Sequence, residues 1–124
     1  MDYLDKLLTG ELYLFEVPKE FRTYAICEVG VAVEGSFLSI VPDEVKDYRL
    51  CKTALENGGS FYDVPKRFRS RELCIMAHLN EDIYKIIPTS FKTYEFLCKL
   101  LEIRYDFKVL QDIRKLLIKK LYIQ

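Results

Sequence analysis

Four cysteines have the widest chemical range in this sequence, because a thiolate binds metal ions, forms disulfides and acts as a nucleophile. They are Cys27, Cys51, Cys74 and Cys98, at intervals of 24, 23 and 24 residues. Structural zinc sites use closely spaced pairs such as C-x-x-C, which these intervals do not provide. Equivalent positions on stacked helices lie about 8–10 Å apart, whereas a disulfide requires Cα atoms within about 7 Å. We therefore expect four buried, reduced core residues, with no metal and no cofactor.

Acid–base catalysis would have to use His78, the only histidine of the chain. A histidine base needs a serine or cysteine nucleophile arranged beside it, and the sequence shows no such arrangement. The carboxylates are scattered without a recognisable pair, and neither a glycine-rich phosphate loop nor H-E-x-x-H is present. We expect a partly buried structural histidine and no enzyme activity.

The most basic segment is KRFRSR at residues 66–71, which has four cations and lies beside Phe61 and Tyr62. Cations next to aromatic rings can bind phosphate or a single-stranded nucleic acid. The formal net charge of zero and the absence of a known nucleic-acid motif disfavour nucleic acid. The candidate binding residues of this segment are Lys66, Arg67, Arg69 and Arg71.

A repeat of 23 or 24 residues contains every proline and every cysteine of the chain. The prolines are Pro18, Pro42, Pro65 and Pro88. Valine or isoleucine precedes each proline. An apolar residue stands three places after the proline, a basic residue four places after it, and Thr, Asp or Ser five places after it. Such fixed-period similarity indicates a repeat architecture. The base of each repeat is Arg22, Lys46, Arg69 or Lys92.

Each repeat has the signals of one helix and one short helical turn. The polar residues Thr23, Asp47, Ser70 and Thr93 are of the type that caps a helix N-terminus. An apolar stripe with helical spacing follows them. We expect Gly35, Gly58 and Asn80 to end these helices in left-handed C-caps. The Val-Pro pair then begins the next turn, since proline requires an extended predecessor and suits a first helical position.

The predicted fold is all-α, with a single domain over residues 1–124 that forms a short helical-repeat solenoid with capped ends. The four repeats comprise about residues 1–22, 23–46, 47–69 and 70–92, and a C-terminal cap spans 93–124. In the cap, an apolar stripe is predicted to cover the core; it consists of Phe107, Leu110, Ile113, Leu117 and Leu121. Its opposite face carries Lys108, Arg114, Lys115 and Lys119. A basic amphipathic helix for a membrane or a partner is the alternative interpretation.

The pattern C-x-x-A-[LV]-x-N-G-x-x-[FL]-x-x-V-P-x-x-[FL]-[RK]-[ST]-x-E-L is carried best by CKTALENGGSFYDVPKRFRSREL, residues 51–73. It resembles the short tandem helical repeats of a bacterial domain family of unknown function, whose units read approximately A-V-x-x-N-G-x-x-L-x-x-V-P. Residues 14–50 match more loosely and residues 93–124 hardly at all. The resemblance implies a helical repeat fold and brings no catalytic residues with it.

Charge is unevenly distributed along the chain. Residues 1–62 hold 6 Lys/Arg and 11 Asp/Glu, whereas residues 63–124 hold 13 and 8. This asymmetry can steer a partner or support head-to-tail self-association. The sequence has no apolar run of membrane-spanning length and no signal peptide pattern, so we expect a soluble cytoplasmic protein, with delivery into another cell left open.

We expect a non-catalytic protein-binding module for a partner with an acidic surface, of the inhibitor, immunity or effector kind. Single-stranded nucleic-acid or phosphate binding through residues 66–71 is the alternative. The repeated bases precede helix N-termini, where a cation gains nothing from the helix dipole. Either their stems cover the joints between repeats, or they form a basic edge that meets the partner. The segment 66–71 is a better candidate for contact with the partner than the row of repeated basic residues.

Overall fold

The computed structural model describes residues 2–123, and all of their regular elements are helical. The α-helices are α1 (Tyr3–Thr9), α2 (Tyr24–Val33), α3 (Tyr48–Glu56), α4 (Arg71–His78), α5 (Tyr94–Ile103) and α6 (Phe107–Ile123). Short 3-10 helices lie between them: η1 (Leu14–Glu16), η2 (Lys19–Phe21), η3 (Gly35–Ile40), η4 (Phe61–Asp63), η5 (Lys66–Phe68), η6 (Tyr84–Ile86) and η7 (Thr89–Phe91). The all-α prediction is confirmed, while the continuous solenoid stays a prediction.

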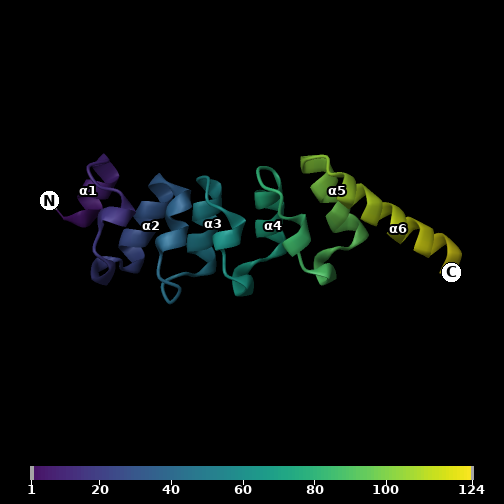
Figure 1. Cartoon of the computed structure of the whole chain (residues 1–124), viewed down its shortest axis with the longest axis horizontal. Helices are drawn as coiled ribbons and strands as arrows, with labels where there is room; N and C mark the ends of the chain where they lie inside the picture. The colour runs from purple at the N-terminus through teal and green to yellow at the C-terminus, as the bar shows by residue number, and fades with distance from the viewer. Residues whose placement is uncertain (1, 124) are drawn as a thin grey trace. The chain divides into compact units, whose positions relative to one another are not determined.

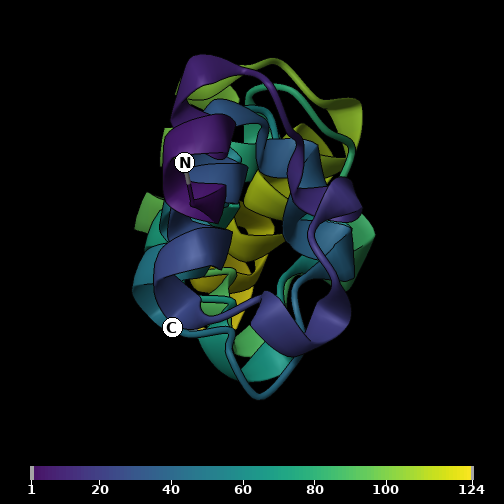
Figure 2. The same cartoon turned by 90° about the vertical axis from the view of Figure 1, so that its left-hand side faces the viewer.

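The chain forms two compact units, of which the N-terminal unit ends at Arg69 and the C-terminal unit begins at Ser70. In the N-terminal unit, α2 packs against both α1 and α3 (Figure 1). Figure 2 looks onto this unit from its N-terminal side and shows α1, in purple, beside α2, in blue. In the C-terminal unit, α5 packs against both α4 and α6. The prediction of one domain over the whole chain stays a prediction.

The predicted N-caps begin four helices. The side chains of Thr23, Asp47, Ser70 and Thr93 accept hydrogen bonds from the backbone N–H of the third residue that follows. Asp2 caps α1 in the same way. Each cap satisfies a donor of the first turn that has no partner inside its helix.

The helix C-termini differ in part from the prediction. Among the described residues only Gly10 and Gly58 have positive φ, at 83° and 89°. The predicted left-handed C-caps at Gly35 and Asn80 are therefore wrong, since α2 ends before an extended Glu34 and α4 ends before Leu79, which is right-handed. Gly58 follows α3 with positive φ, as predicted.

Gly35 is needed for a close backbone approach. A Cβ added there would lie 2.1 Å from the carbonyl oxygen of Ala54 and 2.5 Å from the nitrogen of Gly59. The Gly35 N–H donates to the carbonyl of Asn57 at 3.0 Å. The start of η3 thus rests directly on the end of α3, and only a residue without a side chain fits between them.

The core of each unit joins α-helix residues to the short turns. The apolar residues one and four places before each proline are buried in all four repeats; they are Leu14, Val17, Leu38, Val41, Phe61, Val64, Tyr84 and Ile87. Cys27, Cys51 and Cys74 are buried, whereas Cys98 is partly exposed. The prediction of a buried fourth cysteine is therefore wrong, while the reduced state of the thiols stays a prediction.

The predicted apolar stripe of α6 is also mostly wrong. Of its five residues only Ile113 is buried, and Phe107 and Leu121 are exposed by 55% and 74%. The buried edge runs through Val109 and Ile113 instead. A helix has 3.6 residues per turn, so positions 109, 113 and 116 lie on one face of α6. The predicted stripe through 110, 113 and 117 is rotated away from this face.

We expect Gly35→Ala to lower the free energy of unfolding by about 1–3 kcal/mol, because the methyl group must displace backbone atoms at the end of α3. Thermal and urea unfolding of the variant measure this loss. The matched control is Ser36→Ala at the next, exposed position. Equal midpoints for the two variants would contradict the close approach.

The cysteines should differ in reactivity. Burial raises the pKa of Cys51 to about 11, against an opposing effect of the Lys46 ammonium, so its reactive thiolate is scarce near pH 8. We expect an aromatic disulfide reagent to label Cys98 first in the native protein and all four thiols after unfolding. The fast phase should vanish in Cys98→Ser; a fast phase that persists would place the accessible thiol elsewhere.

Candidate anion-binding site

Arg22 binds the backbone of its own repeat. Its Nε donates to the carbonyl of Val17 at 2.9 Å, and its Nη2 donates to the carbonyl of Phe15 at 3.2 Å. A third, longer contact of 3.5 Å joins Nη1 to the carbonyl of Ile40 in the next repeat. The guanidinium thereby satisfies acceptors that a one-turn helix leaves without a partner.

Arg69 repeats this arrangement 47 places later. Its Nε donates to the carbonyl of Val64 at 2.8 Å, and its Nη2 donates to that of Tyr62 at 3.4 Å. The guanidinium carbon also lies 5.3 Å from the centre of the buried Phe61 ring. The same two acceptor places are thus used in two repeats, which favours a structural role for this position.

The lysines at the same repeat position behave differently from each other. The Lys46 ammonium donates to the carbonyl of Asp63 at 3.2 Å and lies 3.4 Å from the carboxylate of Asp43, with a side chain only 8% exposed. The Lys92 ammonium lies 4.0 Å from the centre of the Tyr84 ring. Lys92 also lines a pocket of the C-terminal unit.

The predicted segment 66–71 is divided between the two units. In the N-terminal unit, Lys66 and Arg67 are exposed, and the Arg67 guanidinium lies 4.6 Å from the centre of its neighbour Phe68. In the C-terminal unit, Arg71 lies 4.6 Å from the centre of Phe91. Both guanidiniums already rest on rings of their own unit, and a joint binding site for the segment stays a prediction.

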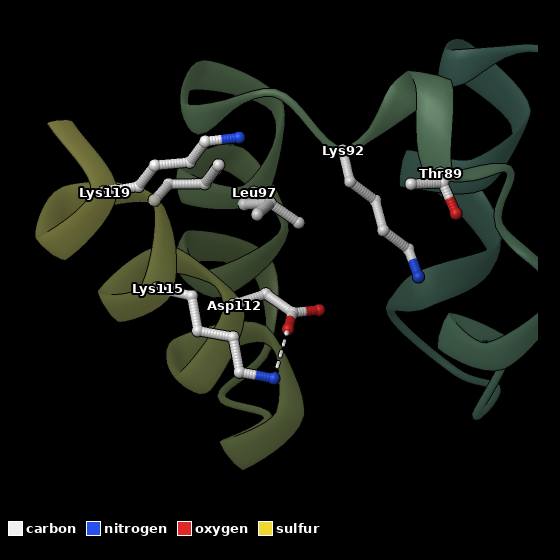
Figure 3. Close-up of a pocket in the computed structure, with 7 residues that line it drawn as sticks. Thr89, Lys92, Leu97, Asp112, Lys115 and Lys119 are labelled. Atoms are coloured by element: carbon white, nitrogen blue, oxygen red, sulfur yellow. Dashed lines mark ion pairs between the residues drawn. The ribbon is translucent and has the colours of Figure 1, made fainter. Parts of the chain in front are cut away.

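A pocket of about 310 Å³ lies in the C-terminal unit and was missed by sequence reasoning. The turn at 89–92, α5 and α6 form its walls, as Figure 3 shows. Its lining residues are Thr89, Lys92, Leu97, Asp112, Lys115, Leu116 and Lys119. Lys115 and Lys119 were expected only on the solvated face of α6. In the sequence, the pocket could have been recognised from positions 112, 115, 116 and 119. Neighbouring members of this set on one face of a helix are three or four residues apart.

Asp112 is the one carboxylate of the pocket and has partners within the unit. The Tyr84 hydroxyl donates to its Oδ2 at 2.5 Å, and the Lys115 ammonium lies 3.8 Å from its Oδ1. Burial, and secondly the hydrogen bond to Asp112, raise the pKa of the Tyr84 hydroxyl above its ordinary value. Tyr84 therefore remains a donor at neutral pH and holds Asp112 in place.

The pocket combines an excess of positive charge with an apolar floor. Three lysines and one aspartate line it, together with the apolar side chains of Leu97 and Leu116. In Figure 3 the Lys92 and Lys119 side chains come from opposite walls, and Lys115 reaches Asp112. Lys119 has no ion-pair partner among the residues that the structure describes. This arrangement suits an anion that carries apolar groups.

His78 is fully buried in the C-terminal unit, so the prediction of a partly buried histidine is wrong. Its Nε2 lies 3.2 Å from the carbonyl oxygen of Arg104, and the Arg104 Nε donates to the His78 carbonyl at 2.8 Å. The imidazole has no exposed surface. This pair of reciprocal contacts joins the end of α4 to the end of α5.

Within residues 2–123 no helix is long and apolar enough to cross a membrane, and no cluster of three or more His, Cys, Asp or Glu side chains is placed to hold a metal ion. No protein-family model, curated protein or solved structure matches the chain. The resemblance to a bacterial tandem-repeat family therefore stays a prediction.

We expect Arg69→Met to lower the free energy of unfolding by about 1–3 kcal/mol, because two backbone carbonyls lose a charged donor. Lys66→Met is the matched control, since its side chain is exposed and lies in the same short segment. Urea unfolding measures both. A loss in Arg69→Met no larger than in the control would contradict the structural role of the repeated arginine.

Proposed function

We propose that this chain is a non-catalytic protein-binding module and that its C-terminal unit binds an acidic group of a partner protein. The observation that carries the proposal is that Lys92, Lys115 and Lys119 line one pocket together with the apolar Leu97 and Leu116. Lysine ammoniums are compact charges that attract a carboxylate without requiring one fixed geometry. The apolar floor adds affinity for a neighbouring aliphatic or aromatic side chain.

The size of the pocket favours a side chain or a short segment as its occupant. Its volume of about 310 Å³ is at the lower end of the range of roughly 300–1,000 Å³ for small-molecule sites. The excess of bases extends beyond the pocket, since residues 70–124 hold 10 Lys/Arg and 7 Asp/Glu. Such a surface accelerates the approach of an acidic protein and discriminates against a basic one. An inhibitor, immunity or effector protein fits this mode of action.

Nucleic-acid binding through residues 66–71 has less support. Arg67 and Arg71 rest on the rings of Phe68 and Phe91, so these faces are already covered on one side. Arg69 is bound to backbone carbonyls. Stacking of successive bases needs free aromatic faces beside a basic groove.

The test is a binding titration with a fluorescein-labelled peptide of alternating glutamate and leucine, followed by anisotropy at low salt. We expect the double variant Lys115→Gln/Lys119→Gln to bind about tenfold more weakly, since each exposed charge pair contributes up to about 1 kcal/mol. The control, Lys85→Gln/Lys99→Gln, changes the net charge equally outside the pocket and should bind nearly as the wild type does.

Equal weakening of peptide binding in the two double variants would show that only the net charge matters, and would contradict binding in the pocket. Absence of binding by the wild type would contradict it as well. Tight binding of an oligothymidylate with a steep salt dependence would instead favour the nucleic-acid alternative.

A further inference from the structure

Three aromatic rings of the N-terminal unit form a cluster at the surface. They belong to Tyr13, Phe15 and Phe37, where η1 lies against η3. The ring centres are 6.1 Å apart for Tyr13 and Phe15, 5.9 Å for Tyr13 and Phe37, and 5.7 Å for Phe15 and Phe37. We refer to these three residues as the aromatic cluster.

The cluster leaves much apolar area in water. Tyr13 is 45% exposed and Phe15 is 57% exposed, and Phe37 is half-buried. Contiguous exposed rings of this kind on a folded surface indicate an interaction site more often than isolated ones do. The rings already pack on one another, so their outward faces are the surface offered to a partner.

Two carboxylates are fixed beside the rings by the backbone of the same segments. The Glu16 Oε1 accepts a hydrogen bond from the N–H of Tyr13 at 3.0 Å. The Glu34 Oε1 accepts from the N–H of Ser36, the neighbour of Phe37, at 3.4 Å. Each carboxylate keeps further acceptor sites, since an ionised carboxyl has about four lone-pair positions. The surface therefore combines aromatic faces with negative charge.

Four other rings of the chain lie under its own cations. Arg67 lies over Phe68 and Arg69 over Phe61 in this unit, and Arg71 and Lys92 lie over rings of the other unit. No cation of the described residues lies over the aromatic cluster. The base bonded to this segment is Arg22, whose Nε and Nη2 are occupied by carbonyls of η1 and of the residue after it.

We propose that the aromatic cluster, with Glu16 and Glu34, is a docking surface for an arginine-bearing segment of a partner protein. A guanidinium stacks flat on an aromatic face while its edge donates to a carboxylate, and here both groups are present on one surface. The excess of acids in this unit, 12 Asp/Glu against 9 Lys/Arg in residues 1–69, supports the same preference for a cationic partner. The surface is separate from the pocket of the C-terminal unit and prefers the opposite charge.

The test is a titration of the 15N-labelled full chain with an end-blocked peptide of alternating arginine and glycine, followed by NMR. We expect the largest shifts at the amides of Tyr13 to Glu16 and of Ser36 and Phe37. Phe15→Leu/Phe37→Leu keeps apolar bulk and removes two of the three π faces, and should weaken binding roughly fivefold to tenfold. Glu16→Gln/Glu34→Gln keeps an acceptor for each N–H and should weaken it roughly fivefold.

The matched charge control is Glu20→Gln/Glu44→Gln, which changes the net charge of the same unit equally at two exposed positions outside the cluster. Equal weakening in both acidic doubles, or shifts spread over the unit, would overturn the proposal. So would a wild type that fails to bind the peptide at low salt, or Phe variants that bind as well as the wild type does. Sedimentation of the wild type as a dimer that Phe15→Leu/Phe37→Leu dissociates would identify a second copy as the occupant, and would overturn the separate partner.

Discussion

Short turns with unpaired carbonyls are the constraint on which the packing of this chain depends. A 3-10 helix of three residues makes few internal hydrogen bonds, yet its buried apolar residues place its backbone close to the core. In two repeats an arginine four places after the proline donates to the carbonyls five and seven places before it. The arginine side chain thus links the residues after the proline of its repeat to the backbone before that proline. The adjoining α-helix is then free to use its cap and its apolar face for packing.

The two units are built from similar repeats but carry different surfaces. In the N-terminal unit, the aromatic cluster lies in the segments before Pro18 and Pro42 and remains at the surface. Backbone N–H groups of the same segments bind the carboxylates of Glu16 and Glu34. In the C-terminal unit the turn before α5 meets a long α6, and a lysine of the repeat joins two lysines of that helix. One chain therefore offers an acidic aromatic surface and a basic pocket.

Local features were predictable from the sequence, and long-range ones were not. The N-caps at Thr23, Asp47, Ser70 and Thr93 follow from residue type and from bonds three places long. Gly35 was misassigned because its reason is a contact with the end of α3, some 20 residues away, rather than its own φ. The α6 stripe failed because hydropathy could not choose between two neighbouring helix faces. The pocket was missed because it requires the 89–92 turn and α6 to meet.

The arginine contacts also bear on how the chain folds. Donors and acceptors five and seven places apart close small loops, so little chain entropy is lost before each contact forms. Helix packing within a unit likewise joins successive elements, as α1 with α2 and α2 with α3. Topologies built from such near neighbours fold rapidly, and a local opening in one repeat leaves the turns of another intact. Amide hydrogen exchange should therefore report protection that varies from repeat to repeat, in steps, instead of one uniform value for the protein.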